Sequence, residues 1–498
     1  MRRAWIGLLA LALAAPVAGQ EELGSVQEAL AASSRLSGSA GPASVNWIEA
    51  GQQFSYTIRN PQTRELEVRR FDPVSLADER LFDARNLTLP GTAEPIQYRS
   101  FEFGQDSRNL VFQTNFRPIY RNSGLADFYL YSLDTETLRL GAKDARTADL
   151  SPGGGQLGFE RGGNLYVVDL ENGEERQLTD VDGDSVFNGA FDWVYEEEFG
   201  FAQAWKWSPD SRRIAYWQTD ERGVPVIQLT DWEDRHPDWF RINYPKVGDE
   251  NPEVRIGVVD VASGETVWLD TGIETEHYVP RIYWTSDPNT LAVATLNRPQ
   301  NHLKLFFFDV RTGERRLVME ERSDAWIDVF DFFAGVDDYF YFPDGIREFF
   351  WVSDRDGYNH LYRYGYDGEL LNRVTEGEWV VTRVEGIDPE AGVVYYTGTE
   401  ASPLERQLYA VGFDGTGARR LTPERGTHSI DMAPGGRYYI DRWSNTETPR
   451  QVELWTTADG GRKLDMLEDN AGVREYVAGH VHSPLELFSF TTSDGVEL

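Results

Sequence analysis

A hairpin-like unit recurs along the chain at intervals of about 50 residues, and this repeat constrains the fold more than any other feature. Each unit has alternating apolar residues, an Asp or small turn residue, a glycine and a short closing strand. Clear copies begin at Asn164 (NLYVVDLENGEERQLT), Val254 (VRIGVVDVASGETVWLD) and Leu303 (LKLFFFDVRTGERRLV). Alternation buries one face of a strand, and the glycine supplies the positive φ of a tight turn, so each unit is predicted to be a β-hairpin.

Further copies and a second element complete the repeat. Weaker hairpin copies begin at Leu66, Asp127, His360, Arg406 and Val452. A turn followed by a short apolar strand often precedes the hairpin, as in WSPDSRRIAYW, LSPGGGQLGFE and MAPGGRYYIDR. Together these elements give about four strands per unit and about eight units, which is typical of a β-propeller.

We therefore predict an all-β fold, a β-propeller of about eight four-stranded blades, over residues 44–482. A pair of β-sandwiches lacks such regular spacing, and a β-helix has much shorter repeats. The aromatic-rich stretch over residues 323–350 fits the repeat poorly and leaves the blade count open by one.

The charge balance restricts the partners. The 82 acidic and 48 basic side chains give a formal net charge of −34. Such a chain repels nucleic acid and anionic lipid, so neither is an expected partner, whereas a cationic ligand is favoured. The absence of cysteine excludes disulfides and thiolate chemistry. His480 and His482 alternate on one face but lack a third ligand, so neither a metal nor an organic cofactor is expected.

The N-terminal residues are typical of an export signal. Arg2 and Arg3 precede an apolar run, and the small residues Ala18 and Gly19 follow it, so residues 1–19 are predicted to be a cleavable signal peptide. An uncleaved anchor is the alternative. The expected location is periplasmic or secreted. Residues 20–43 contain a predicted short helix at about 26–33 and a Ser/Gly/Ala-rich linker, outside any blade.

Residues 180–204 break the repeat and contain the sequence DWVYEEEF, which begins at Asp192. Asp192 can cap a short helix, and Gly200 lies just after it. Neighbouring glutamates on one helical turn can converge on one point, where a protonated amine would relieve their repulsion. In so acidic a chain, an acidic triplet by itself is more often a solvated face.

DWVYEEEF resembles the glutamate motif of the dipeptidyl peptidase IV family, in the prolyl oligopeptidase clan of serine peptidases. The resemblance implies that Glu197 and Glu198 bind the free N-terminal amine of a peptide substrate and that Glu196 is structural. The segment YRNSGLA, from Tyr120, resembles the family segment that carries a substrate-binding arginine, which falls on Arg121. The expected substrate-binding residues are therefore Glu197, Glu198 and Arg121.

The family's catalytic Ser-Asp-His triad lies in a C-terminal α/β-hydrolase domain, with its nucleophile on a G-x-S-x-G elbow that this sequence lacks. Residues 483–498 resemble only the first strand and turn of that domain. No catalytic residue is therefore expected in this chain. The catalytic residues are expected beyond residue 498, and the chain is expected to be inactive alone. In the family, the segment corresponding to residues 20–43 packs on the hydrolase domain.

The resemblance implies that the intact protein is a serine-type dipeptidyl peptidase that removes X-Pro or X-Ala dipeptides from peptides with a free N-terminus. Its other expected partners are the absent hydrolase domain and, in a possible homodimer, a second copy. The alternative is a non-enzymatic periplasmic β-propeller that serves as a binding or scaffold module. Another clan member, such as an oligopeptidase, is disfavoured because it has no use for an amine clamp.

Overall fold

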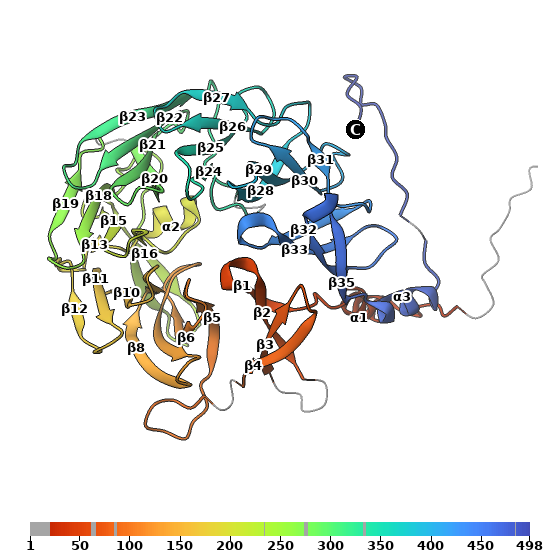
Figure 1. Cartoon of the computed structure of the whole chain (residues 1–498), viewed down its shortest axis with the longest axis horizontal. Coiled ribbons are helices and arrows are strands. Elements are labelled where there is room, and N and C mark those ends of the chain that lie inside the picture. Colours follow the sequence, from red (N-terminus) through yellow and green to blue (C-terminus); the bar gives the residue numbers. More distant parts are fainter. Residues whose placement is uncertain are drawn as a thin grey trace, which may run out of the picture.

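The computed structural model describes residues 20–60, 66–83, 87–233, 235–272, 277–331, 335–483 and 485–498. In these residues, seven four-stranded sheets and one five-stranded sheet form a ring of eight blades (Figure 1). This confirms the predicted all-β propeller and its blade count. The predicted signal peptide, residues 1–19, lies outside the described residues.

Blades 1 to 3 have four strands each, and blade 4 has five. Blade 1 has β1 (Ala43–Ile48), β2 (Gln53–Arg59), β3 (Leu66–Asp72) and β4 (Ala77–Phe82). Blade 2 has β5 (Tyr98–Phe103), β6 (Asn109–Pro118), β7 (Gly124–Ser132) and β8 (Thr137–Ala145). Blade 3 has β9 (Thr147–Leu150), β10 (Gln156–Arg161), β11 (Asn164–Asp169) and β12 (Glu175–Gln177). Blade 4 has β13 (Val186–Asn188), β14 (Trp205–Trp207), β15 (Arg213–Asp220), β18 (Glu253–Asp260) and β19 (Thr266–Leu269).

The last four blades each have four consecutive strands. Blade 5 has β20 (His277–Trp284), β21 (Thr290–Asn297), β22 (His302–Asp309) and β23 (Arg315–Arg322). Blade 6 has β24 (Phe340–Tyr341), β25 (Glu348–Ser353), β26 (His360–Gly365) and β27 (Leu370–Arg373). Blade 7 has β28 (Val381–Asp388), β29 (Val393–Gly398), β30 (Gln407–Gly412) and β31 (Arg419–Arg420). Blade 8 has β32 (Thr427–Met432), β33 (Tyr438–Ser444), β34 (Gln451–Thr456) and β35 (Arg462–Glu468).

The repeat chemistry explains the hairpins. In the three clear copies, Gly173, Gly264 and Gly313 occupy the turn between the third and fourth strands with φ of 76°, 77° and 75°. L-residues rarely adopt this conformation, so the position needs glycine. The aspartate before the turn accepts backbone N–H groups in the copies at Asp169 and Asp260. Each copy therefore encodes its own turn.

A second side-chain device recurs in three blades. The Asn164 amide donates to the Val181 carbonyl, and the Thr179 hydroxyl accepts the Leu165 N–H. This joins the start of the third strand to the segment after the fourth. The same arrangement, with the same residue spacing, occurs with His360 and Thr375 in blade 6 and with Gln407 and Thr422 in blade 7.

The ring closes through side chains, because blade 1 takes its four strands from the start of the propeller and blade 8 takes its four from the end. Between blades 8 and 1, the Trp47 indole donates to the Asp431 carboxylate at 2.9 Å. Phe54 of blade 1 packs in one buried cluster with Ile440 and Val452 of blade 8. Middle strands such as β21 are buried along most of their length because neighbouring blades cover both faces.

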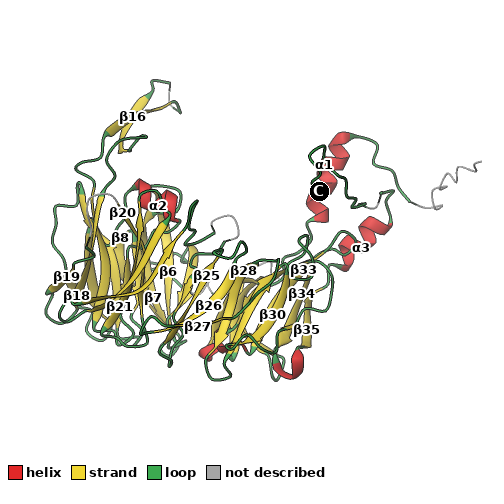
Figure 2. Cartoon of the chain, turned by 90° about the horizontal axis from the view of Figure 1, so that it is seen from above, coloured by secondary structure: helices red, strands yellow, loops and turns green. Residues whose placement is uncertain are grey.

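Each of the two segments that flank the propeller contains a helix, and backbone hydrogen bonds join the two segments. Helix α1 (Val26–Leu36) confirms the predicted helix and extends past residue 33. Helix α3 (Ala471–Ala478) follows the last blade. The Glu21 N–H donates to the Gly479 carbonyl, and the Val481 N–H donates to the Glu21 carbonyl, so the segments before and after the propeller lie side by side (Figure 2).

The final residues form no strand of a larger sheet. Thr491 and Glu497 pair in an isolated antiparallel bridge, and Phe490 exchanges two backbone hydrogen bonds with Leu498. Residues 490–498 therefore fold back on themselves, and Phe488 before them is 81% exposed. Among the described residues, no helix combines the length and apolarity that a membrane crossing requires.

A two-stranded arm interrupts blade 4. Strands β16 (Val226–Asp231) and β17 (Asp238–Asn243) pair only with each other, between β15 and β18. Figure 2 shows the arm rising from the same face of the ring as α2 (Trp193–Phe199). The repeat pattern of the sequence gives no signal of this arm.

Candidate functional site

Helix α2 lies on the inner side of the ring because it interrupts the innermost strand of blade 4 (Figure 1). Strands β13 and β14 each have only three residues, and both pair with β15. They are two halves of one strand position, with α2 between them. The insertion predicted between two units therefore falls within a blade, and its helix lies beside the central opening.

Both ends of α2 are capped as the sequence predicts. The Asp192 carboxylate accepts the N–H groups of Val194 and Tyr195 at 3.1 and 3.2 Å. Gly200 ends the helix in the left-handed conformation, with φ of 74°. Capping at both ends stabilises a helix of only seven residues, which is too short to be stable alone.

Blade 5 holds the buried face of α2. The Tyr195 ring is 1% exposed, and its hydroxyl accepts the Val279 N–H at 3.1 Å. Buried Arg281 donates to the Phe199 carbonyl at 3.0 Å, near the negative end of the helix. Arg281 thus holds the C-terminal end of α2 against blade 5. The sequence does not reveal this role, because a lone arginine on a strand gives no signal of its partner.

The structure brings Arg121 and Glu197 together. Arg121 lies in the loop between β6 and β7 of blade 2, and its Nε lies 2.9 Å from Oε2 of Glu197 on α2. The Glu197 side chain is 14% exposed, whereas Arg121 is 65% exposed. The ion pair therefore connects blade 2 to the helix inserted in blade 4, and Glu197 is held in a largely dehydrated position.

The other two glutamates differ sharply in environment. Glu198 is exposed, and its side chain makes no hydrogen bond or ion pair with any residue in the described ranges. Glu196 is 0% exposed, and its Oε1 accepts the N–H groups of Asn122 and Ser123 at 2.7 and 2.8 Å. Sequence analysis could not identify this contact, because any residue type can supply a backbone N–H.

Burial shifts the pKa values of several acidic groups in blades 2 to 4. Burial raises the pKa of Asp192 to about 6 despite its two backbone donors. Burial, with a smaller contribution from Asp192, raises the pKa of Glu221 to about 7. Burial also raises the pKa of Glu160 to about 7 and that of the Tyr120 hydroxyl to about 12. These four groups therefore hold their protons to a higher pH than exposed groups of the same kind.

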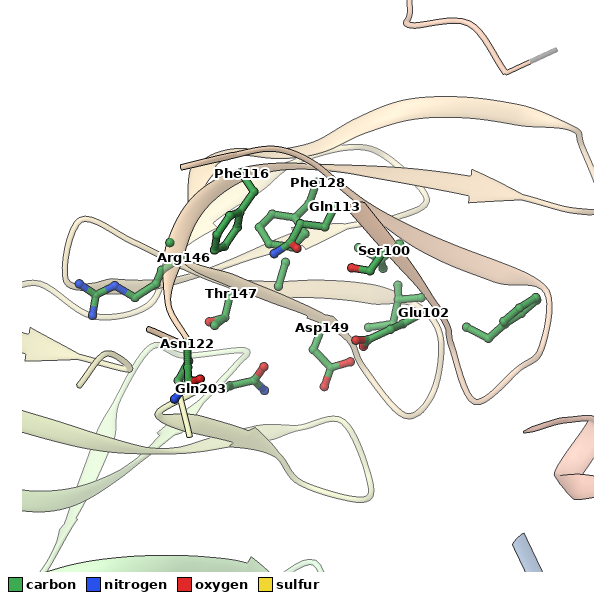
Figure 3. A pocket seen from close by; sticks show the side chains of 16 residues that line it. Ser100, Glu102, Gln113, Phe116, Asn122, Phe128, Arg146, Thr147, Asp149 and Gln203 are labelled. Carbon is green, nitrogen blue, oxygen red and sulfur yellow. The ribbon is translucent and has the colours of Figure 1, made fainter. Parts of the chain in front are cut away.

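A cavity of about 180 Å³ lies beside the Arg121 loop, between blades 2 and 3 (Figure 3). Asn122 and Arg146 line one end, whereas Glu102 and Asp149 lie together at the other. Burial raises the pKa of Asp149 to about 6, and Glu102 adds to this shift. Within the described ranges, no cluster of three His, Asp or Glu side chains is arranged to hold a metal ion.

Comparisons with known proteins identify relatives of the chain. Residues 104–450 match the family model of the dipeptidyl peptidase IV (DPP IV) N-terminal region. The probable dipeptidyl peptidase 4 of Arthroderma benhamiae is 26% identical over 476 residues, which cover 91% of this chain and 58% of that protein. The probable dipeptidyl peptidase 4 of Emericella nidulans is 28% identical over 475 residues, with 91% and 60% covered. The chain thus spans about three fifths of the length of these relatives.

A solved structure extends the match to three dimensions. The crystal structure of Porphyromonas gingivalis dipeptidyl peptidase 4 superposes with a TM-score of 0.83 at 28% identity, covering 96% of this chain and 66% of that one. The family model covers well over half of the present chain. The chain therefore belongs to the dipeptidyl peptidase IV family and corresponds to its N-terminal β-propeller region.

Proposed function

We propose that this chain is the substrate-recognition propeller of a secreted serine dipeptidyl peptidase, with Glu197 and Glu198 binding the free N-terminal amine of a peptide. The observation that carries this proposal is the ion pair between Arg121 and Glu197, 2.9 Å long and formed on the inner side of the ring. This ion pair brings together two segments that resemble the family's substrate-binding motifs, although Arg121 and Glu197 are 76 residues apart in the sequence.

The charges of the site suit a protonated amine. An ammonium group has three N–H donors and can bridge two carboxylates, each charge-assisted bond contributing about 1.5–3 kcal/mol. Glu198 is exposed and has no partner among the described residues that an amine would have to displace. Arg121 neutralises part of the charge on Glu197 and has further guanidinium N–H groups for a peptide carbonyl.

An amine-binding site at a fixed place sets the distance between the peptide's N-terminus and the bond that is cleaved. If the first residue is held at α2, only the second peptide bond reaches the catalytic serine, which would belong to an α/β-hydrolase domain outside this chain. The products would be X-Pro or X-Ala dipeptides. Acyl transfer needs no metal or organic cofactor, because the serine, its histidine base and an oxyanion hole supply the chemistry.

The segments flanking the propeller suit docking of that domain. Val26 and Leu30 of α1 are 71% and 68% exposed, and Leu487 and Phe488 of the tail are 67% and 81% exposed. Apolar side chains this exposed on the segments that flank the propeller are typical of an interaction surface. We assign residues 20–43 and 483–498 to this interface.

The β16–β17 arm is the proposed contact of a homodimer. Trp232, Trp239 and Phe240 are 77%, 61% and 54% exposed on a ribbon that pairs with no other described strand. A two-stranded ribbon is marginally stable alone and gains most from a second surface. A second copy of the chain would provide one.

The test uses the longer gene product that includes the hydrolase domain. Glu197→Ala and Glu198→Ala should each lower kcat/KM for Gly-Pro-anilide by at least about tenfold, because each removes a charge-assisted bond. Glu171→Ala is the matched control, because Glu171 is an exposed glutamate at the hairpin turn of blade 3. Unchanged turnover in both site variants would refute the clamp. A gene product without a hydrolase domain would instead favour the binding or scaffold module.

A further inference from the structure

Glu196 contacts the Arg121 loop more closely than either glutamate assigned to substrate binding. It is 0% exposed, and its Oε1 accepts two backbone N–H groups from consecutive residues of blade 2. These donors, Asn122 and Ser123, directly follow Arg121 in the chain. Glu196 directly precedes Glu197, so the buried contact and the ion pair involve adjacent residues on both sides.

Burying a carboxylate here is costly. The second oxygen of Glu196, Oε2, is buried without a hydrogen-bond partner in the described residues, and so is the Ser123 hydroxyl. An apolar side chain of similar size would avoid both the desolvation of a charge and the unpaired oxygen. What a glutamate provides is the pair of charge-assisted bonds to the loop, which are among the stronger hydrogen bonds in proteins.

The exposed ion pair cannot position the loop by itself. Arg121 is 65% exposed, and exposed ion pairs contribute little because water and salt screen them. The bond from Ser123 to Glu196 is buried and the bond from Asn122 is partly buried, so water and salt screen this contact less than the exposed ion pair. Of the two links between blade 2 and α2, the buried one therefore determines where the loop sits, and Arg121 meets Glu197 as a consequence.

We propose that Glu196 is a positioning residue, whose carboxylate fixes the loop over residues 120–123 onto α2 and thereby presents Arg121 to Glu197. The structural part of this inference stands on the contacts themselves. Its consequence for peptide binding rests on the proposed function of the site. Glu196 touches no substrate in this scheme and acts only through Arg121.

The structural part is tested by hydrogen–deuterium exchange on the 498-residue chain. Glu196→Ala should accelerate exchange of the Asn122 and Ser123 amides by at least about tenfold, because both lose their acceptor. Glu196→Gln keeps an acceptor oxygen in place but removes its charge, so it should accelerate exchange less than Glu196→Ala does. Glu405→Ala removes a buried, hydrogen-bonded carboxylate in blade 7 and should not alter these amides. Unchanged exchange in Glu196→Ala would overturn the proposal.

The functional part uses a double-mutant cycle in the longer gene product. Arg121→Ala and Glu196→Ala should each lower kcat/KM for Gly-Pro-anilide about tenfold, and the double variant should lose no more than Arg121→Ala alone. Additive losses would show that Glu196 acts independently of Arg121 and would overturn the positioning role. If wild-type turnover does not depend on a free amine, the clamp fails, while the exchange result still decides the role of Glu196.

Discussion

Glu160 offers a sharp test of how buried charge sets the stability of this propeller. It lies on β10 of blade 3, is 2% exposed, and accepts the Gly163 N–H at 2.6 Å. Burial raises its pKa from the usual 4.5 to about 7. The folded protein therefore keeps a proton on Glu160 at pH values where the unfolded chain has lost it.

The sign of the effect follows from this proton. The stabilisation from Glu160 is complete below pH 4.5 and is lost as the pH rises through about 7. A pKa raised by this amount corresponds to about 3 kcal/mol of unfolding free energy. For a chain of this length the entropy of unfolding is about 1 kcal/mol per kelvin, so the shift in Tm is about 3 °C.

The assay compares thermal unfolding of wild type and Glu160→Gln at pH 5, 6, 7 and 8. Glutamine keeps an acceptor for Gly163 but does not titrate, so the variant should lose about 3 °C less than wild type between pH 5 and 8. The −34 net charge destabilises both proteins as the pH rises, and the comparison removes this shared effect. Parallel Tm curves would refute the reasoning.

Two further predictions concern α2 and the arm. Asp192→Ala should lower the free energy of unfolding by about 1–2 kcal/mol and expose the insertion to proteolysis, because the cap is lost; Asp192→Asn should not, and equal protease resistance in both would contradict this. In the longer gene product, Trp239→Glu should shift the sedimentation coefficient from dimer to monomer, because it places a charge on the exposed aromatic face of the arm. Identical sedimentation would exclude the arm as the dimer contact.

Much of the fold is readable from the sequence because each hairpin carries its own turn chemistry. The glycines at 173, 264 and 313 occupy equivalent turns with nearly equal φ, so local signals and the global repeat agree. The caps of α2 are readable for the same reason, because Asp192 and Gly200 act on their own backbone neighbourhood. The meeting of Arg121 with Glu197 was expected only through the family resemblance.

The rest depends on contacts that leave no pattern in the sequence. Strands β13 and β14 have three residues each, too few to show a period, so the placement of α2 within blade 4 could not be predicted. Glu196 binds backbone N–H groups, which every loop residue except proline supplies. The aromatic residues of the β16–β17 arm resemble ordinary buried strand residues in the sequence, and only the fold shows that they are exposed.

The most direct measurement compares Gly-Pro-anilide with its N-acetyl form as substrates of the longer gene product. If Glu197 and Glu198 grip an ammonium group, wild type should prefer the free amine by at least about 100-fold, since two charge-assisted bonds are lost on acetylation. The Glu197→Gln/Glu198→Gln variant should lose most of this preference. Equal turnover of both substrates by wild type, or an undiminished preference in the double variant, would contradict the account.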